Sequence, residues 1–367
     1  MNRRLRIILF LIASILVVQT TYASSSEYTC HAVLWQKGVI PYSYATGINN
    51  AGQIVGDSEN ASGDTHAFLW HKGVMNDLGT LPGKTNSYAT GINNAGQIVG
   101  KSFNNSGYTR AFLWENGVMT DLGTLPGGSE SEANGINNNG QIVGFSSSSS
   151  GGHAFLWKNG VMTDLGTLPG ETYSYATGIN NAGQIVGESL NNSGYLHAFL
   201  WKNGVMTDLG TLPGNTDSYA FGINNAGQIV GYSQNAAGNY HAFLWHKGVM
   251  NDLGTLPGGS HSYAHGINDK GQIVGMSFNA SGDTHAFLWH KGVMNDLGTL
   301  PGGPDSDAFG INNAGQIVGD SENASGDTHA SLWYKGKITD LGTLPGKTNS
   351  DAFGINNSGQ IVGDCET

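Results

Sequence analysis

The stretch THAFLWHKGVMNDLGTLPG at residues 65–83 occurs again, letter for letter, at residues 284–302. Near-copies of this stretch fill the chain between the two positions. All eight tryptophans of the chain lie in it, and the last six intervals between them are 43 or 44 residues. A period of this length is typical of repeat architectures, in which each unit is one supersecondary element.

A second marker, Gly-Gln-Ile-Val-Gly, recurs with the same period. Its eight copies begin at Gly52, Gly96, Gly140, Gly183, Gly227, Gly271, Gly315 and Gly359. Together the two markers account for nearly the whole chain after the first 30 residues.

Each unit is expected to form four short strands, which we call a, b, c and d. In one unit they are residues 153–157 (a), 161–167 (b), 174–180 (c) and 184–189 (d). Each run is rich in aromatic or β-branched residues and is bounded by Gly, Asn, Pro or Ser, as hairpin strands are. No stretch keeps the 3.6-residue apolar period of a helix. The chain is therefore predicted to be all-β.

Four strands in about 44 residues make one blade of a β-propeller. A linear solenoid would need polar capping repeats at its ends, and neither end has one. We therefore predict an eight-bladed β-propeller, with seven blades plus a remnant as the alternative. The order of strands within a blade stays open. The blade is c-d-a-b if the Leu-Pro-Gly segment crosses between blades, and it is one whole unit if the d–a loop crosses.

The first 23 residues have the pattern of a signal peptide. Three arginines precede an apolar run at residues 7–18, and Thr21-Tyr22-Ala23 offers small residues for cleavage. An uncleaved membrane anchor is the alternative, although the run is short for a span of ~20 residues. We expect a short linker at 24–29, a single propeller domain at 30–367, and a secreted or periplasmic location. No later segment is apolar enough to cross a membrane.

The charge of the chain excludes some partners. Without the three leader arginines, 13 basic residues remain against 27 acidic residues. Nucleic acid and anionic lipid both require clustered Lys and Arg, so neither is expected as a partner. Glycine, at 57 of 367 residues, indicates many tight turns.

The chain has two cysteines, Cys30 and Cys365. Both stand where the repeat would have its d–a loop, one at each end of the chain. In an exported protein such a pair predicts a disulfide. A Cys30–Cys365 bond would close the ring covalently; two free thiols are the alternative.

Three motifs in fixed order resemble those of HAF-repeat proteins, a family of predicted extracellular bacterial repeat proteins. They are His-Ala-Phe, Asp-Leu-Gly-Thr-Leu-Pro-Gly and Gly-Ile-Asn-Asn-Ala-Gly-Gln-Ile-Val-Gly, which recur over residues 31–363. Departures are mild, with Val33 and Ser331 in place of Phe and Arg110 in place of His. The resemblance implies export and a repeat architecture. It implies no reaction, cofactor or ligand.

Several polar residues recur once per unit. A histidine opens strand a in seven units, and an aspartate precedes Leu-Gly-Thr in seven. They could ring a central channel with metal ligands, but a metal ion needs three or four ligands converging on one point. We therefore expect a hydrogen bond within each blade and no metal or cofactor. Asn49-Asn50 and their copies are attributed to turn geometry, because Asn tolerates a left-handed backbone.

The copies differ most in the b–c and d–a loops, which share one rim of an antiparallel propeller. Loops on a rigid scaffold commonly carry binding sites. Near this rim one slot, after a serine, is aromatic or acidic in every unit. Its members are Tyr44, Tyr88, Glu132, Tyr175, Tyr219, Tyr263, Asp307 and Asp351. Aromatic faces beside polar groups suit sugar rings; ordinary packing between blades is the alternative for any single tyrosine.

We therefore predict an exported, monomeric, non-catalytic binding protein, with glycans as the favoured ligand. An extracellular protein partner is the second hypothesis. A glycoside hydrolase or lyase is the third, because enzymes need unique groups and near-identical repeats offer few of them. The residues that break the repeat, and so could serve an enzyme, are Glu130, Glu132, Asp217, His261, His265, Asp305 and Asp307.

Overall fold

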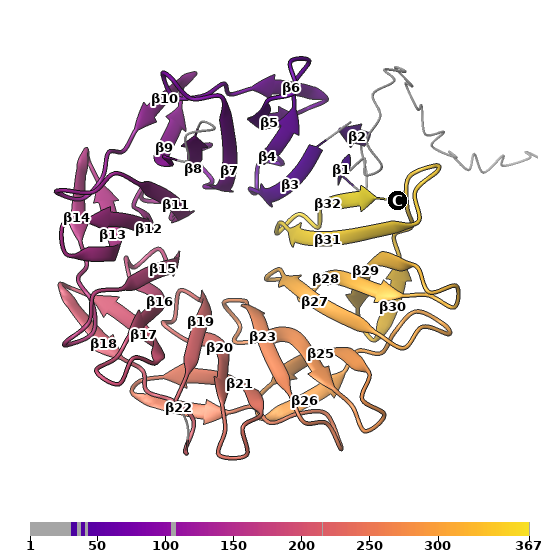
Figure 1. The fold of residues 1–367 in the computed structure, drawn as a ribbon. Coiled ribbons are helices and arrows are strands. Elements are labelled where there is room, and N and C mark those ends of the chain that lie inside the picture. Colours follow the sequence, from indigo (N-terminus) through magenta and orange to yellow (C-terminus); the bar gives the residue numbers. More distant parts are fainter. Residues whose placement is uncertain (1–30, 35–37, 41–42, 104–107, 215, 367) are drawn as a thin grey trace, which may run out of the picture.

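The chain folds into a ring of blades. The computed structural model describes residues 31–34, 38–40, 43–103, 108–214 and 216–366. Its 32 strands form eight four-stranded antiparallel sheets around a central axis (Figure 1), and the described residues include no helix. The prediction of an all-β propeller built from four-stranded repeats is confirmed.

Seven blades are each made from one continuous segment. Blade I contains β3 (Ser43–Ile48), β4 (Ile54–Glu59), β5 (Thr65–His71) and β6 (Val74–Asp77). Blade II contains β7 (Asn86–Ile92), β8 (Ile98–Phe103), β9 (Arg110–Glu115) and β10 (Val118–Asp121). Blade III contains β11 (Ser131–Ile136), β12 (Ile142–Ser148), β13 (Gly151–Lys158) and β14 (Val161–Asp164). Blade IV contains β15 (Ser174–Ile179), β16 (Ile185–Leu190), β17 (Leu196–Lys202) and β18 (Val205–Asp208).

The next three blades repeat the pattern. Blade V contains β19 (Ser218–Ile223), β20 (Ile229–Gln234), β21 (Tyr240–His246) and β22 (Val249–Asp252). Blade VI contains β23 (Ser262–Ile267), β24 (Ile273–Phe278), β25 (Thr284–His290) and β26 (Val293–Asp296). Blade VII contains β27 (Ser306–Ile311), β28 (Ile317–Glu322), β29 (Thr328–Tyr334) and β30 (Lys337–Asp340).

Blade VIII joins the two ends of the chain. It contains β31 (Asn349–Ile355), β32 (Ile361–Glu366), β1 (His31–Leu34) and β2 (Gly38–Ile40). Strand β1 pairs with β32 in an antiparallel ladder that runs from His31↔Cys365 to Leu34↔Val362. Backbone pairing therefore closes the ring. Cys365 lies opposite the residue that follows Cys30, and Cys30 itself lies outside the described residues.

The strand order settles the alternative that the sequence left open. Each sheet runs c-d-a-b, as in β3-β4-β5-β6. The Leu-Pro-Gly segment therefore crosses between blades, and the sequence repeat is offset from the blade by half a unit. Strand c of every blade lies innermost (Figure 1). The c–d and a–b turns share one rim, and the d–a loops and b–c segments share the other.

Two kinds of glycine make this geometry possible. In the a–b turn of blade I, Lys72 and Gly73 both have positive φ, 52° and 86°, as a type I′ hairpin turn requires. In strand d, Gly56 lies so close to strand c that an added Cβ would sit 1.8 Å from the Tyr44 carbonyl oxygen. A β-bulge between Ala45 and Gly47 accompanies this close approach.

The hydrophobic core lies between neighbouring blades. One cluster combines Val55 and Leu69 of blade I with Ala89, Ile98 and Phe112 of blade II, all at most 8% exposed. Similar clusters recur around the ring. The blades therefore depend on one another for burial of apolar surface, which is the main favourable contribution to folding.

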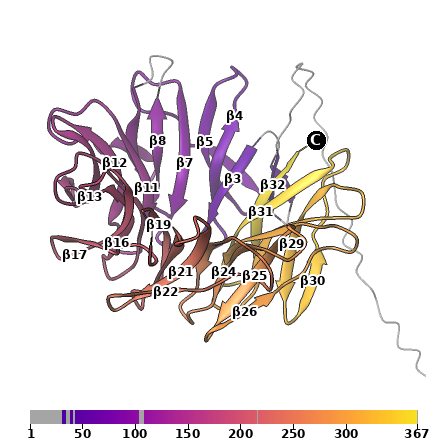
Figure 2. The same ribbon diagram turned by 60° about the horizontal axis from the view of Figure 1, so that its bottom comes forward.

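Figure 2 shows the same ring tilted, with the strands of each blade running between the two rims. The part of the chain that the structure describes contains no helix with the length and hydropathy of a membrane span. The predicted signal peptide and linker, residues 1–29, lie outside that part.

Candidate functional site

The central channel has two differently built mouths. At the mouth formed by the c–d turns, each turn begins with a buried asparagine. The Asn49 Oδ1 accepts hydrogen bonds from the backbone N–H of Ala51 and of Gln53, both 3.0 Å. Its Nδ2 donates to the Gln53 Oε1 at 2.7 Å and to the Asn93 carbonyl of the next blade at 3.0 Å. One side chain thus shapes its own turn and joins two blades.

This inter-blade hydrogen bond repeats around the whole ring. The bond from Asn356 to the Asn49 carbonyl, 3.0 Å, completes the circle. The eight members are Asn49, Asn93, Asn137, Asn180, Asn224, Asn268, Asn312 and Asn356.

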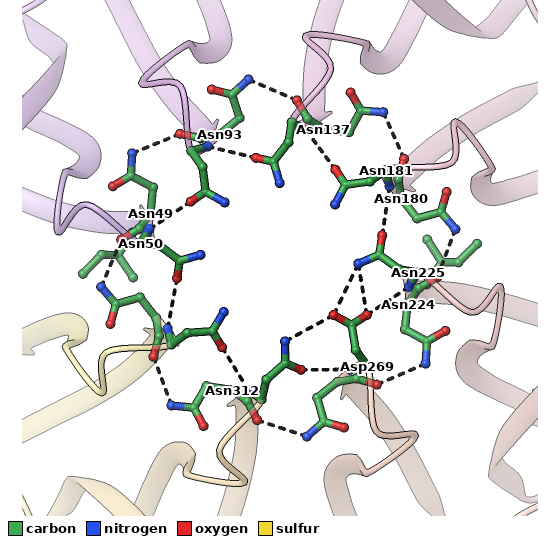
Figure 3. Close-up of a pocket in the computed structure, with 18 of the residues that line it drawn as sticks. Asn49, Asn50, Asn93, Asn137, Asn180, Asn181, Asn224, Asn225, Asp269 and Asn312 are labelled. Atoms are coloured by element: carbon green, nitrogen blue, oxygen red, sulfur yellow. Dashed lines mark hydrogen bonds between the residues drawn. The ribbon is translucent and has the colours of Figure 1, made fainter.

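The second residue of each turn forms another closed ring, which we call the amide ring. The Asn50 N–H donates to the Asn94 Oδ1 at 3.0 Å, and each following blade repeats this contact. The members are Asn50, Asn94, Asn138, Asn181, Asn225, Asp269, Asn313 and Asn357 (Figure 3).

Asp269 is the one carboxylate in the amide ring. It accepts Nδ2 hydrogen bonds from Asn225 at 3.1 Å and from Asn313 at 3.2 Å. The two rings, together with Ile48 and its copies, line a cavity of about 350 Å³.

The left-handed backbone predicted for these asparagines is wrong, because none of them has a positive φ. Of the c–d turn of blade I, only Gly52 has positive φ, 74°. Asn49 acts through its side-chain oxygen instead. The rings themselves were missed. The available signal was that nearly every turn is Asn-Asn, although one asparagine would suffice for the turn.

The opposite mouth contains the slot predicted to bind ligand. Each slot residue on strand c faces a residue of strand d directly across the ladder, so both side chains lie on one face. The facing pairs are Tyr44–Asp57, Tyr88–Lys101, Glu132–Phe145, Tyr175–Glu188, Tyr219–Tyr232, Tyr263–Met276, Asp307–Asp320 and Asp351–Asp364. The strand d residues were missed. Their signal was the variability of the position after Gln-Ile-Val-Gly.

Blades I and II line an open pocket at this mouth. Tyr44, Asp57, Tyr88, Lys101 and Phe103 line a cavity of about 450 Å³ with four neighbouring residues. The Tyr88 and Phe103 rings are stacked, with centroids 5.4 Å apart and planes within 5°. Burial raises the pKa of Asp57 to about 6. The pocket therefore combines aromatic faces with one acid and one base.

In blades III and IV the slot residues, Glu132 and Tyr175, make contacts within the protein. The Tyr175 hydroxyl donates to Glu132 at 2.9 Å and to the Asn134 Oδ1 at 3.2 Å. Lys101 forms an ion pair with Glu132, with Nζ and Oε2 3.1 Å apart. Burial, followed by the charge of Glu132, raises the pKa of Tyr175. These contacts leave Tyr175 a positioned, half-buried side chain.

Blades V and VI form an aromatic cluster around Tyr232. Its ring centroid lies 4.8 Å from Tyr219, 5.4 Å from Phe221, 5.4 Å from Tyr240 and 4.9 Å from Tyr263. Burial raises the pKa of Tyr232 to about 12. Phe221 remains 40% exposed, so part of the cluster faces solvent.

Blades VII and VIII carry carboxylates in the same position. Burial, and then the negative charges of Asp351 and Asp307, raises the pKa of Asp320 to about 8. Burial raises the pKa of Asp351 to about 6. The His265 Nε2 of blade VI lies 3.3 Å from the Asp307 Oδ1. The described residues contain no group of three or more His, Cys, Asp or Glu that could hold a metal ion.

The repeated His and Asp residues pair within blades. In blade IV the His197 Nδ1 lies 2.9 Å from the Asp208 Oδ2, and the Asn191 Nδ2 lies 2.9 Å from the His197 Nε2. The hydrogen bond to Asp208 raises the pKa of His197. Burial disfavours the charged Asp208, but hydrogen bonds from His197 and the Gly210 N–H outweigh burial and lower the pKa of Asp208.

Five other blades have the same pair at 2.8 or 2.9 Å. The pairs are His66–Asp77, His153–Asp164, His241–Asp252, His285–Asp296 and His329–Asp340. The expected hydrogen bond within the blade is therefore confirmed for these units. His31 belongs to β1, whose side chains are outside the described part.

Most of the residues proposed for an enzyme have structural contacts. The Asp217 Oδ1 accepts from the Leu196 N–H at 3.2 Å, and the Asp305 Oδ1 accepts from the Thr284 N–H at 2.7 Å. Each thereby holds the start of strand a in the preceding blade. The His261 Nδ1 lies 2.8 Å from the Ser260 Oγ. The Glu130 backbone carbonyl accepts from the Ser147 N–H at 2.9 Å, a contact that does not involve the Glu130 carboxylate.

Comparison with protein-family models and with curated proteins gives no match. Solved structures do match. A puromycin-hydrolysing peptidase of Mycobacterium tuberculosis has a TM-score of 0.52 and 12% identity, over 82% of this chain and 52% of that chain. An acylaminoacyl peptidase of Pyrococcus horikoshii has 0.49 and 14%, over 83% and 53%. The chain thus spans about half the length of either peptidase.

The β-propeller domain of the Trilobed protease from Pyrococcus furiosus matches with a TM-score of 0.49 and 12% identity. That match covers 82% of this chain and 96% of the domain. Only the match to the puromycin-hydrolysing peptidase has a TM-score above 0.5, and at 12% identity it shows a likeness of fold alone.

Proposed function

We propose that this chain is an exported, non-catalytic binding protein that holds carbohydrate at the rim formed by the d–a loops and b–c segments. The pocket between blades I and II carries the proposal. Its volume of about 450 Å³ is within the roughly 300–1,000 Å³ typical of ligand pockets. Tyr44, Tyr88 and Phe103 supply aromatic faces, and Asp57 and Lys101 supply an acceptor and donors for hydroxyl groups.

The chemistry of a sugar ring fits these groups. Aromatic faces carry partial negative charge, which attracts the C–H groups on one side of a pyranose. A few fixed polar groups then select the orientation of the ligand. The aromatic cluster of blades V and VI offers a second surface on the same rim. Two sites on one rigid ring would strengthen binding to a repeating glycan through multivalency.

A glycan-array screen of residues 24–367, with and without calcium, tests the proposal. Binding should be lost in a Tyr44→Ala, Tyr88→Ala double variant. Tyr195→Ala is the matched control, because Tyr195 is 44% exposed on a d–a loop and does not line the pocket. A folded protein that binds no glycan would contradict the proposal and leave a protein partner as the next hypothesis.

Export is part of the proposal, and it has its own test. Amino-terminal sequencing of the protein from the periplasm or medium should begin at Ser24. A chain that stays in the cytoplasm, or keeps its first 23 residues in a membrane, would contradict it.

Glycoside hydrolysis is a second candidate, favoured by Asp307 and Asp320. The two residues face each other in the ladder, which places their Cβ atoms about 5 Å apart. One carboxyl with a pKa of about 8 beside another is the arrangement that separates a general acid from a base. Turnover of any bound glycan that is lost in Asp320→Asn would support this candidate over simple binding.

A further inference from the structure

The amide ring contains side-chain N–H donors that take no part in the turns or in the contacts between blades. In each of its asparagines the Oδ1 accepts a backbone N–H from the preceding blade, as Asn94 does from Asn50 at 3.0 Å. Turning the amide over would place Nδ2 against that N–H group and lose the hydrogen bond. The orientation of each side-chain amide is therefore fixed, and its Nδ2 points away from the backbone N–H that its Oδ1 accepts.

Figure 3 shows the amide nitrogens of Asn50 and Asn181 directed toward the middle of the ring. Five members have an Nδ2 with no acceptor within the described part of the chain. These are Asn50, Asn94, Asn138, Asn181 and Asn357. All five residues line the cavity of about 350 Å³ at this mouth, and they follow one another along one arc of the ring.

We propose that the amide ring is a binding site for a small oxyanion, such as phosphate, sulfate or a carboxylate. Oriented N–H groups that converge on one cavity stabilise negative charge without rearranging, as other anion sites built from amides do. A hard cation would need oxygen ligands, and the ring's amide Oδ1 atoms are directed at backbone N–H groups instead. The site lies on the rim opposite the proposed carbohydrate pocket, so it goes beyond that function.

Asp269 weakens this site in the natural sequence. Its carboxylate places a like charge beside the bound oxyanion, and it occupies the Nδ2 donors of Asn225 and Asn313. Replacing it by asparagine, the residue of the other seven units, removes the charge and releases two donors. Asp269→Asn should therefore bind oxyanions more tightly than the natural protein.

The chain also supplies the opposite variant. Asp269 accepts the Asn225 N–H through Oδ1 at 3.1 Å, so a carboxylate maintains the ring's backbone hydrogen bond. Asn94→Asp should keep the Asn50 contact in the same way, while it adds a second negative charge and removes one donor. Asn295→Asp, on the outer strand β26, is the control for net charge.

Isothermal titration calorimetry with sodium phosphate, sulfate or acetate at fixed ionic strength tests the proposal, and the anion that binds identifies its class. We expect one site per chain, a Kd at least about threefold lower in Asp269→Asn, and a Kd about tenfold higher in Asn94→Asp. Asn295→Asp should match the natural protein. The absence of saturable binding in Asp269→Asn, or equal affinity in all four proteins, would overturn it.

Discussion

The side-chain amide of Asn356 donates a 3.0 Å hydrogen bond to the backbone carbonyl of Asn49, although 307 positions separate the two residues. The same bond joins Asn180 to Asn224, which are 44 positions apart, also at 3.0 Å. The junction between the first and last copies of strand c is therefore built like a junction inside the chain. Closure leaves no weakened seam at the channel.

Asn356→Ala should lower the free energy of unfolding by roughly 2–4 kcal/mol, because buried partners lose their hydrogen bonds. The side chain donates to Asn49 and Gln360 and accepts from the N–H groups of Ser358 and Gln360. Urea unfolding measures the change. Asn94→Ala removes one hydrogen bond at an exposed position and should cost less than about 1 kcal/mol. Equal losses would contradict this account.

Gly100→Ala should prevent strands β7 and β8 of blade II from pairing closely, because the new Cβ would lie 1.9 Å from the Tyr88 carbonyl oxygen. We expect a loss of stability above about 4 kcal/mol, measured by thermal unfolding. Gly91→Ala is the matched control in the same blade, since its Cβ would meet nothing nearer than 3.8 Å. A Gly100→Ala protein as stable as Gly91→Ala would show that the strands can separate at no cost.

Asp320→Asn should stabilise the protein at high pH. The pKa of Asp320 is about 8 in the folded chain against a reference of 3.8. The folded state therefore holds a proton that the unfolded state releases, and stability falls as pH rises between about 4 and 8. The variant has no such loss, so it should exceed the natural protein by a few kcal/mol at pH 8.5, on the order of the shift.

Near pH 4 the natural protein and Asp320→Asn should be close in stability. Glu59→Gln, at an exposed position, controls for the loss of one negative charge. A stability difference between Asp320→Asn and the natural protein that does not change from pH 4 to 8.5 would rule out a protonated Asp320.

The Cys30–Cys365 disulfide stays a prediction with a direct test. Non-reducing peptide mapping should recover the two cysteines in one linked peptide. If they are instead free, Cys365 should react slowly with iodoacetamide at neutral pH. It is buried, and burial raises the pKa of its thiol to about 11. Rapid labelling of Cys365 in the folded protein would contradict both outcomes.

The fold followed from the sequence because the repeat restates one strand pattern eight times. Which residues of strands c and d face each other across the ladder did not follow from the sequence. Counting back from the c–d turn without a bulge pairs Tyr44 with Ser58. The bulge between Ala45 and Gly47 shifts the register, so Tyr44 faces Asp57. One extra residue changes which side chains share a face, and the motif alone does not reveal it.

The two rings of asparagines could not be predicted from the sequence, for a different reason. The first asparagine of each turn has a sufficient local role, since the Asn49 Oδ1 holds two N–H groups of its own turn. Its second role depends on the Asn93 carbonyl, which comes near only when the blades close around the axis. A contact that exists only between units cannot be predicted from the sequence of one unit.

The half-unit offset between the sequence repeat and the blade determines what a duplication or deletion of one repeat does to the ring. A duplication or deletion of one whole 44-residue unit adds or removes one complete blade. The strands at the two ends of the chain, β1 with β2 and β31 with β32, are untouched, and they still complete one blade together. The chain can therefore change in length by whole units and still join its two ends in the same way, and a duplication of this kind would produce identical stretches such as those at 65–83 and 284–302.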